Sequence, residues 1–326
     1  MCQKLSTSVI ANLYFLLYNI TVSKAIVFVS AIKNSEEGEW FMGSFPIGVI
    51  LESFRLERGL AIKKAAEIGA DGIQMYATKG ENAPENLSAS ARKELLREVK
   101  DAGLVFSALC GDLGMGFGNP EYNPELIEKS KRIVDLAKDL ETDIVTTHIG
   151  VVPKDTNAER YKIMQEACYT LSRYADSVDA HFAIETGPEP ADVLKGFLDA
   201  LGSTGVAVNL DPANLKMVTG DDPVQAVYTL KDYIVHTHAK DGNRLRECNP
   251  EYIYRVVHPV PEDIQGVAFF EEVPLGTGSV DFPRYLKALA DIGYRGFLTI
   301  ERETGDTPEQ DIRTAYNFLK QSISNI

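Results

Sequence analysis

Eight short apolar runs alternate with amphipathic segments between residue 42 and the C-terminus, and this alternation constrains the fold more than any other feature. The runs are rich in Val, Ile, Phe or Ala, as is typical of strands buried on both faces of a parallel sheet. Several of the helical segments between them end at glycine, as in Ile68-Gly69 and Ile292-Gly293. The strands are expected at residues 46–51, 72–77, 105–110, 144–148, 182–186, 206–210, 234–238 and 296–300.

Eight strand–helix units fit a closed barrel better than an open doubly wound sheet, so we predict an α/β fold of the (β/α)₈ (TIM) barrel class. The expected helices include residues 60–68, 124–140, 160–174, 191–201 and 285–292. A single barrel commonly takes about 250 residues, and no low-complexity linker divides this region. Residues 42–326 are therefore expected to form one domain.

The chain begins with a stretch that does not fit this pattern. Residues 9–32 are apolar enough to suggest a membrane anchor or the hydrophobic part of a signal peptide. Polar side chains interrupt the stretch at Asn19, Thr21, Ser23 and Lys24, and no clear small-residue cleavage site is present. We predict that residues 1–41 form a poorly ordered extension outside the barrel, with a signal or an anchor as the alternative.

The net charge and the cysteine pattern limit the expected binding partners and the expected cellular compartment. The net charge of −14, from 47 acidic and 33 basic residues, opposes binding to phosphate backbones, so no nucleic acid partner is expected. Cys2, Cys110, Cys168 and Cys248 are scattered without the spacing of a redox or zinc motif. This usage is typical of reduced thiols in a cytoplasmic protein, and a cytoplasmic location is predicted.

Four polar side chains stand where apolar runs end: Glu185, Asp211, His238 and Glu301. The carboxyl ends of barrel strands meet at one mouth, so these groups are expected to converge. Each alone fits a hydrogen-bonded rim residue, but three carboxylates and an imidazole together would repel one another unless a divalent cation neutralised them. We predict one such cation, with Mn²⁺ favoured by the oxygen-rich ligand set and Mg²⁺, Co²⁺ and Zn²⁺ as alternatives.

Other polar groups are expected around the same mouth. His148, at the end of the fourth strand, is predicted to face the pocket and to hydrogen-bond the substrate. Lys240 and Asp241 follow His238 and either contact substrate hydroxyls or form a rim salt bridge. About thirty residues, 242–272, separate the seventh strand from its helix, which indicates a lid or an oligomer contact. His258 lies in this segment without an assigned role.

Five motifs, "IETG", "NLDPANL", "HTHAKDGNR", "EVPLGTGSVDF" and "TIERE", resemble the xylose isomerase-like superfamily of sugar isomerases and epimerases. The resemblance spans nearly everything after residue 42. It implies that Glu185, Asp211, His238 and Glu301 bind the metal, and that the two glutamates are catalytic and exchange protons with the substrate. The implied reaction removes a proton beside a carbonyl through a metal-stabilised enediolate. Two glutamates acting on opposite faces would epimerise a sugar, whereas a single base would isomerise it, and both outcomes stay open.

The resemblance also bears on the substrate, which is expected to be a sugar or cyclitol. Related ketose epimerases use an arginine on the substrate at the position of Arg244, so Arg244 is expected to bind substrate. Ketose 3-epimerases carry a substrate-binding His where this chain has Asn214, and a Glu where it has Ala191. These differences predict a different sugar or an inositol-like substrate, with Asn214 at the substrate-binding position. Similar family members are often dimers or tetramers, so a homo-oligomer is compatible with the resemblance.

The sequence is compatible with several other functions. A metal-dependent dehydratase of inososes or dehydroshikimate would use the same enolate chemistry, as would an epimerase of 3-keto-glycosides. An AP endonuclease of the endonuclease IV type is the alternative from another class. Its three-metal site needs additional His and Asp ligands that this chain does not show, and the acidic charge counts against DNA binding. A barrel that binds a ligand without catalysis is the remaining alternative.

Overall fold

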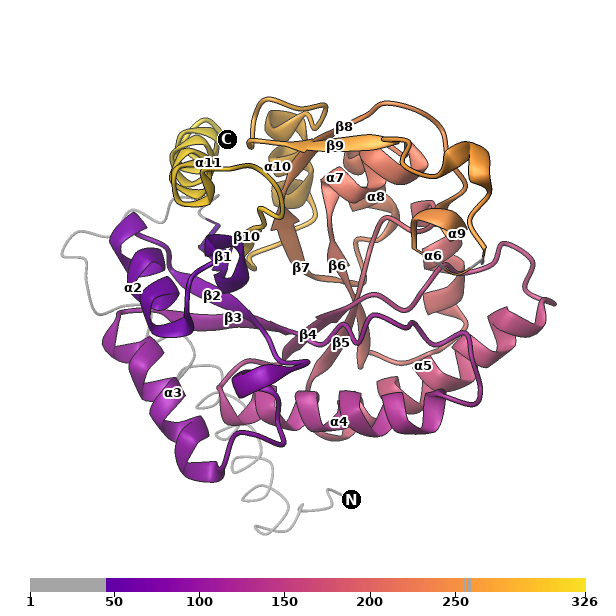
Figure 1. The fold of residues 1–326 in the computed structure, drawn as a ribbon, viewed down its shortest axis with the longest axis horizontal. Coiled ribbons are helices and arrows are strands. Elements are labelled where there is room, and N and C mark those ends of the chain that lie inside the picture. The colour runs from indigo at the N-terminus through magenta and orange to yellow at the C-terminus, as the bar shows by residue number, and fades with distance from the viewer. Residues whose placement is uncertain (1–44, 255, 257–258) are drawn as a thin grey trace, which may run out of the picture. The chain divides into compact units, whose positions relative to one another are not determined.

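A computed structural model describes residues 45–254, 256 and 259–326, and these residues build a closed barrel of eight parallel strands wrapped by helices (Figure 1). The neighbour order around the barrel is β1-β10-β7-β6-β5-β4-β3-β2. The predicted fold class and all eight predicted strands are confirmed. The barrel strands are β1 (Ile47–Ile50), β2 (Gly72–Tyr76), β3 (Val105–Cys110), β4 (Ile144–Thr147), β5 (His181–Glu185), β6 (Val206–Leu210), β7 (Ile234–Ala239) and β10 (Leu298–Ile300).

Helices surround the strands, and their ends carry the expected signals. The Glu57 carboxylate accepts a hydrogen bond of 2.6 Å from the Leu60 amide at the start of α2 (Arg58–Ile68), and Gly69 ends that helix with a φ of 96°. All five predicted helices are present. The longer helices are α2 (Arg58–Ile68), α3 (Ala89–Asp101), α4 (Asn123–Asp139), α5 (Glu159–Ser177), α6 (Ala191–Asp199), α8 (Pro223–Thr229), α10 (Phe282–Asp291) and α11 (Pro308–Ile323).

The interior of the barrel is polar near the mouth. Hydrogen bonds link Gln74 on β2 to Thr146 on β4 and to His238 on β7, so these three side chains point into the barrel. Apolar side chains such as Phe197 and Leu286 are fully buried on the surrounding helices and belong to the hydrophobic core. The buried apolar layer therefore stabilises the scaffold, while polar groups gather at the strand ends.

The connection over residues 242–272 has structure that the sequence analysis did not predict. It begins within β8 (Asp241–Arg244), which pairs antiparallel with β9 (Phe270–Val273) in a separate two-stranded sheet (Figure 1). Between these strands lie the short helices α9 (Pro250–Ile253) and η4 (Glu262–Ile264). The two strands are short and far apart in sequence, so no local alternation or turn motif indicated the pairing.

Asp241 anchors this sheet to the segment that follows it. Its carboxylate accepts backbone hydrogen bonds from Gly242 (2.9 Å), Gly276 (3.0 Å), Gly278 (2.9 Å) and Val280 (3.1 Å). A Cβ atom at Gly278 would overlap with the Asp241 carboxylate, so a glycine is required there. The carboxylate is thus occupied by backbone amides, and not free for the substrate hydroxyls expected at this position.

The predicted extension, residues 1–41, and the boundary that follows it lie outside the described residues, and so does the apolar stretch 9–32. The poorly ordered extension and its boundary with the barrel therefore stay predictions. The helices formed by the described residues include none with the length and continuous apolar character of a membrane span.

We predict that Asp241→Ala lowers the free energy of unfolding by about 2–4 kcal/mol, because four backbone amides lose a charged acceptor. Urea denaturation of the full chain measures this change. Asp232→Ala, at an exposed position, is the control and should change stability by less than about 0.5 kcal/mol. Equal stability of the two variants would contradict the anchoring role.

Candidate metal centre

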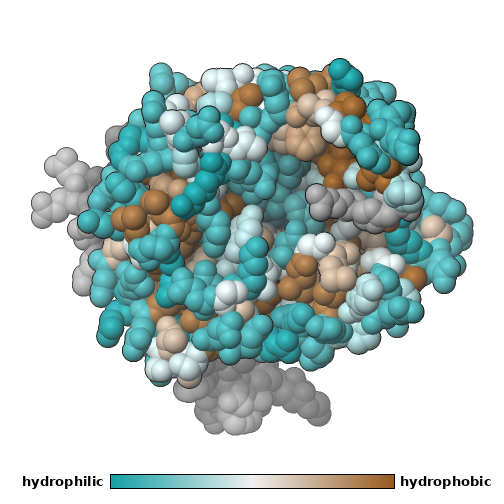
Figure 2. All heavy atoms as spheres, viewed as in Figure 1, coloured by the Kyte–Doolittle hydropathy of each residue, from teal (hydrophilic) through white to brown (hydrophobic). Residues whose placement is uncertain are grey.

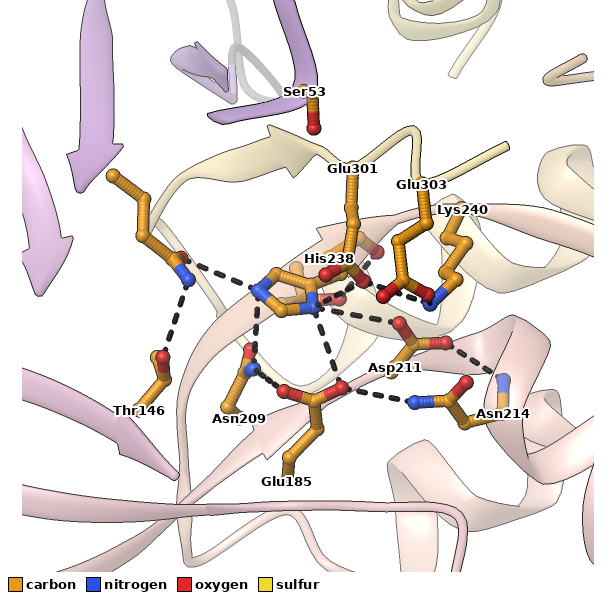
Figure 3. A network of polar contacts seen from close by, with 12 residues as sticks. Ser53, Thr146, Glu185, Asn209, Asp211, Asn214, His238, Lys240, Glu301 and Glu303 are labelled. Carbon is orange, nitrogen blue, oxygen red and sulfur yellow. Dashed lines mark hydrogen bonds and ion pairs between the residues drawn. The ribbon is translucent and has the colours of Figure 1, made fainter. Parts of the chain in front are cut away.

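Four side chains converge at the mouth of the barrel: Glu185, Asp211, His238 and Glu301 (Figure 3). They come from the ends of β5, β6, β7 and β10, which are consecutive strands of the barrel. One ligand atom of each side chain lies within 4.8 Å of those of the other three, and all four residues are buried. A second group of three or more such residues that could hold a metal ion is not found among the described residues.

The imidazole of His238 presents one nitrogen to all three carboxylates. Its Nδ1 lies 3.2 Å from Glu301 Oε2, 3.4 Å from Asp211 Oδ2 and 3.7 Å from Glu185 Oε1. Its Nε2 lies 3.2 Å from Gln74 Oε1, and the Gln74 amide donates in turn to Thr146 Oγ1 at 3.2 Å. A proton on Nε2 satisfies Gln74 and leaves the Nδ1 lone pair directed at the centre, as in a metal-binding histidine.

Two buried atoms at this centre have no hydrogen-bond partner, and they test whether a cation fits. They are Asp211 Oδ2 and His238 Nδ1. The other Asp211 oxygen accepts a hydrogen bond of 2.7 Å from the Asn214 backbone amide. Leaving buried polar atoms unpaired is unfavourable, and a cation shared by the four side chains would satisfy both atoms. The buried acidic and histidine cluster could therefore bind a metal ion.

Charges around the cluster keep two of the carboxylates ionised. Burial alone would raise the pKa of Glu301, but Lys240 and His238 outweigh it and hold that pKa well below its usual range. Burial likewise opposes ionisation of Glu185, but His148 and His238 lower its pKa. The pKa of Asp211, by contrast, is raised, chiefly by burial. Glu185 and Glu301 are thus anionic groups beside the cavity, in the state that a proton acceptor needs.

Lys240 lies at the mouth between two glutamates (Figure 3). Its Nζ donates to Glu301 Oε2 at 3.0 Å and to Glu303 Oε2 at 2.6 Å, and Lys240 is only 4% exposed. Of the two roles expected for Lys240, the salt bridge is therefore present. The ammonium group still borders the cavity, so a role in substrate binding stays a prediction.

Two asparagines position the carboxylate of Glu185. Asn214, in the short helix α7 (Pro212–Asn214), donates from Nδ2 to Glu185 Oε1 at 2.9 Å. Asn209, on β6, donates from Nδ2 to Glu185 Oε2 at 3.2 Å. Asn214 borders the cavity, where it was predicted to bind substrate. Asn209 was missed, although it lies two residues before Asp211 and so on the same side of the strand.

His148 follows β4 and faces the same cavity as the cluster. Its Nδ1 lies 3.3 Å from Asp112 Oδ2 and its Nε2 lies 3.7 Å from Glu185 Oε1. Burial alone would lower the pKa of His148, but Glu185 and Asp112 raise it to about 9. The ring centre is 5.3 Å from that of Tyr254, which lies just after α9. Asp112 and Tyr254 were missed in the sequence analysis because neither ends an apolar run.

A cavity of about 970 Å³ opens in front of the cluster. Figure 2 shows largely hydrophilic residues around the hollow in this face. Ile253, Tyr254 and Phe270 bring the 242–272 connection to the wall of the cavity, in the place expected for a lid. The predicted site residues that line it are Glu185, His238, Glu301, His148, Asn214 and Lys240.

Arg244 is the one predicted site residue that is brought to a different place. Its Nη1 donates to the Thr219 carbonyl oxygen at 3.3 Å. The side chain lines a neighbouring cavity of about 310 Å³, together with Arg160 and Glu189. The structure thus does not bring Arg244 to the wall of the central cavity, and its role in substrate binding stays a prediction. His258 lies outside the described residues.

We predict that metal binding releases a proton from His238. Burial alone would lower the pKa of His238, but Glu301 and Glu185 raise it well above its usual range, so without a cation the imidazole is protonated at neutral pH. A metal must displace that proton, so the apparent affinity should rise by up to about tenfold per pH unit below the raised pKa. Calorimetric titration of Mn²⁺ into the chelator-treated protein, in buffers of different ionisation enthalpy, counts the protons. Affinity independent of pH, without proton release, would contradict the protonated state.

We further predict that Gln74→Leu weakens metal binding by about 10–100-fold, because the variant removes the acceptor that orients His238. Competition with a metallochromic chelator measures the change. Gln310→Leu, at an exposed position of α11, is the matched control and should bind the metal as the wild type does. A wild-type affinity in Gln74→Leu would show that this hydrogen bond does not orient the imidazole.

Comparison with known proteins identifies the family of the chain. The family model "Xylose isomerase-like TIM barrel" matches residues 62–322. A Haemophilus influenzae protein, named provisionally as an L-ribulose-5-phosphate 3-epimerase, is 24% identical over 250 residues, which are 73% of this chain and 81% of that protein. Two inosose dehydratases from Clostridium botulinum are 24% and 27% identical over 151 residues, or 45% of this chain and 48% of each relative.

The fold has close counterparts among solved structures. A xylose isomerase domain protein from Planctomyces limnophilus has a TM-score of 0.70 and 24% identity, with 87% of this chain and 99% of that chain covered. At this identity the similarity supports the fold alone. The barrel and its surrounding helices are therefore shared across proteins whose sequences have diverged widely.

Proposed function

Because this chain belongs to the xylose isomerase-like TIM barrel family, we propose that it is a metal-dependent sugar isomerase or epimerase. The observation that carries the proposal is the convergence of Glu185, Asp211, His238 and Glu301, whose ligand atoms lie within 4.8 Å of one another. We propose that these four residues hold one divalent cation. The oxygen-rich ligand set favours Mn²⁺, with Mg²⁺, Co²⁺ and Zn²⁺ as alternatives.

The proposed reaction begins with removal of a proton from a carbon next to the substrate carbonyl. A bound cation would supply the positive charge that stabilises the negative charge developing on the carbonyl oxygen. Glu185 and Glu301 are the proposed proton carriers, since both border the cavity and their lowered pKa values keep them ionised. If one glutamate removes the proton and the other returns it on the opposite face, the centre is inverted.

Hydrogen bonds from neighbouring side chains hold the carboxylates of the two glutamates in place. Asn214 and Asn209 each donate to one oxygen of Glu185, and Lys240 donates to Glu301. These hydrogen bonds fix the carboxylates before the substrate arrives, so little reorganisation is needed. Lys240 and His148 also border the cavity and can donate hydrogen bonds to substrate oxygens. The 242–272 connection, through Tyr254 and Phe270, would limit the access of water to the reacting atoms.

A dehydratase of inososes is the second candidate, and the two inosose dehydratase relatives favour it. Its first step would be the same proton removal, followed by loss of a neighbouring hydroxyl with a proton from an acid. His148, whose pKa is raised to about 9, is suited to supply that proton. A nuclease of the endonuclease IV type fits less well, because the described residues hold a single group of metal-ligating side chains and the cavity wall is acidic.

Deuterium incorporation tests the proposed function. Mn²⁺-loaded protein in D₂O, incubated with ketoses, keto-inositols and keto-glycosides, should place deuterium on a carbon next to a carbonyl. The labelled position separates isomerisation from epimerisation, and loss of water identifies a dehydratase. Treatment with a chelator should abolish the exchange, and Mn²⁺ should restore it. Exchange that persists without metal would contradict the proposal.

Glu185→Gln and Glu301→Gln should each slow this exchange by about 10²–10⁴-fold, because each variant removes a proton carrier. The metal content of each variant, measured by atomic emission, separates loss of the base from loss of the cation. Glu94→Gln, at an exposed position of α3, is the matched control and should exchange at the wild-type rate. Wild-type exchange in both active-site variants would remove the assigned roles.

A further inference from the structure

We propose that Glu272, on β9, is a positioning residue of the metal centre: it holds the segment that follows β10 and thereby fixes the proposed metal ligand Glu301. This inference rests on the proposed function, since it takes Glu301 as a ligand of the cation. It goes further, because it gives the β8–β9 sheet a part in metal binding.

The hydrogen-bond ladder of the barrel ends close to Glu301. β10 has three residues, Leu298–Ile300, and Glu301 follows the last of them. The Glu301 amide donates to the carbonyl oxygen of Ala239, on β7, at 3.2 Å. Residues 301–307 form neither helix nor strand. Contacts from other parts of the chain must therefore hold this segment in one conformation.

Glu272 makes such contacts with the two residues that follow Glu301. Its carboxylate pairs with Arg302 Nη1 at 2.5 Å, and its two oxygens accept from the Glu303 backbone amide at 3.1 and 3.2 Å. The side chains of Glu272 and Arg302 are only 4% and 8% exposed. Charge-assisted hydrogen bonds are strong, and burial protects them from competing water. Glu272 thus fixes both main chain and side chain directly after Glu301.

Arg302 joins the same segment to two further elements. Its Nε donates to Asp311 Oδ2, on α11, at 2.8 Å. Its backbone amide donates to Ser53 Oγ, in the short helix η1 (Leu51–Phe54), at 3.0 Å. The segment is therefore held from β9, α11 and η1. Glu272 supplies the support from β9, and it also lines the central cavity.

A second connection to the metal centre runs through Lys240. The Lys240 Nζ donates to Glu303 Oε2 at 2.6 Å and to Glu301 Oε2 at 3.0 Å (Figure 3). That oxygen of Glu301 also lies 3.2 Å from His238 Nδ1. A shift of Glu303 would move Lys240 and, with it, the Glu301 oxygen that faces the centre. Glu272 therefore acts on Glu301 through the chain and through this ion pair.

The β8–β9 sheet is held at both of its strands. Asp241, on β8, accepts its four backbone hydrogen bonds from Gly242 and from the segment that follows β9. Glu272, on β9, pairs with Arg302 beside the metal centre. Contacts at both strands make the sheet a fixed wall of the cavity instead of a mobile lid. A fixed wall would keep Glu301 within the narrow geometry that a metal ligand needs.

Glu272→Gln tests the proposal, because it keeps the shape of the side chain and removes its charge. Competition with a metallochromic chelator should show that the full chain binds Mn²⁺ about tenfold more weakly in this variant. Glu309→Gln is the matched control on α11, where the side chain is 42% exposed and pairs with Lys64. The control should bind Mn²⁺ as the wild type does. Wild-type affinity in Glu272→Gln would overturn the proposal.

Arg302→Lys is a second variant, which keeps the positive charge at this place. A lysine ammonium lacks the planar fork that serves Glu272 and Asp311 together, so Mn²⁺ binding should weaken at least about threefold. Urea denaturation of both variants separates this effect from a general loss of stability. Lower stability with unchanged Mn²⁺ affinity in both variants would mean that the Glu272–Arg302 pair supports only the fold, and would refute the positioning role.

The division of the effect between kcat and KM separates positioning from direct contact with the substrate. In the deuterium incorporation assay at saturating Mn²⁺, Glu272→Gln should lower kcat about tenfold, because the proton carrier Glu301 is displaced. KM should change by less than about threefold. A raised KM with unchanged kcat and unchanged Mn²⁺ affinity would show that Glu272 binds the substrate itself, which contradicts the proposal.

Amide hydrogen exchange of the chelator-treated chain separates this proposal from the one it rests on. Peptides covering residues 298–307 should exchange about tenfold faster in Glu272→Gln than in the wild type or in Glu309→Gln. Faster exchange, in a protein whose wild type binds no Mn²⁺, would refute the proposed function and leave Glu272 as the support of this segment. Mn²⁺ binding that Glu272→Gln does not weaken would uphold the metal centre and refute the role of Glu272.

Discussion

The repulsion among three buried carboxylates is the constraint on which the site depends. Glu185, Asp211 and Glu301 lie around one imidazole nitrogen, where little water reduces their interaction. Lys240 and a protonated His238 compensate part of the negative charge, but Asp211 Oδ2 and His238 Nδ1 have no hydrogen-bond partner. A divalent cation resolves both the repulsion and the missing partners, and the same cation would activate a carbonyl.

The barrel explains why residues far apart in sequence meet there. Glu185 is in register with Asn209 on β6, two residues before Asp211, and His238 is in register with Thr299 on β10, two residues before Glu301. Neighbouring strands therefore bring the four side chains to the same end of the barrel. The buried helix packing holds the strands rigidly, and the segments beyond the strand ends are free to differ. The β8–β9 sheet and the segments after β2 and β3 would then determine which substrate reaches the metal.

Much of this arrangement could be predicted from the sequence, because a charged side chain at the end of a buried apolar strand is placed at the mouth of the barrel. That signal identified Glu185, Asp211, His238 and Glu301. It could not identify Gln74 or Asn209, whose hydrogen bonds to His238 and to Glu185 join residues of different strands. Arg244 shows a second limit: it lies on β8, whose pairing with β9 was not predicted, and its guanidinium contacts Thr219 beside another cavity.

Diffraction from Mn²⁺-soaked crystals tests the central claim most directly. An anomalous difference map should contain one strong peak per chain, about 2 Å from ligand atoms of Glu185, Asp211, His238 and Glu301. Such a peak would establish that the four side chains share a single cation. A peak elsewhere, several peaks in the cavity, or an empty cluster at saturating Mn²⁺ would contradict the account.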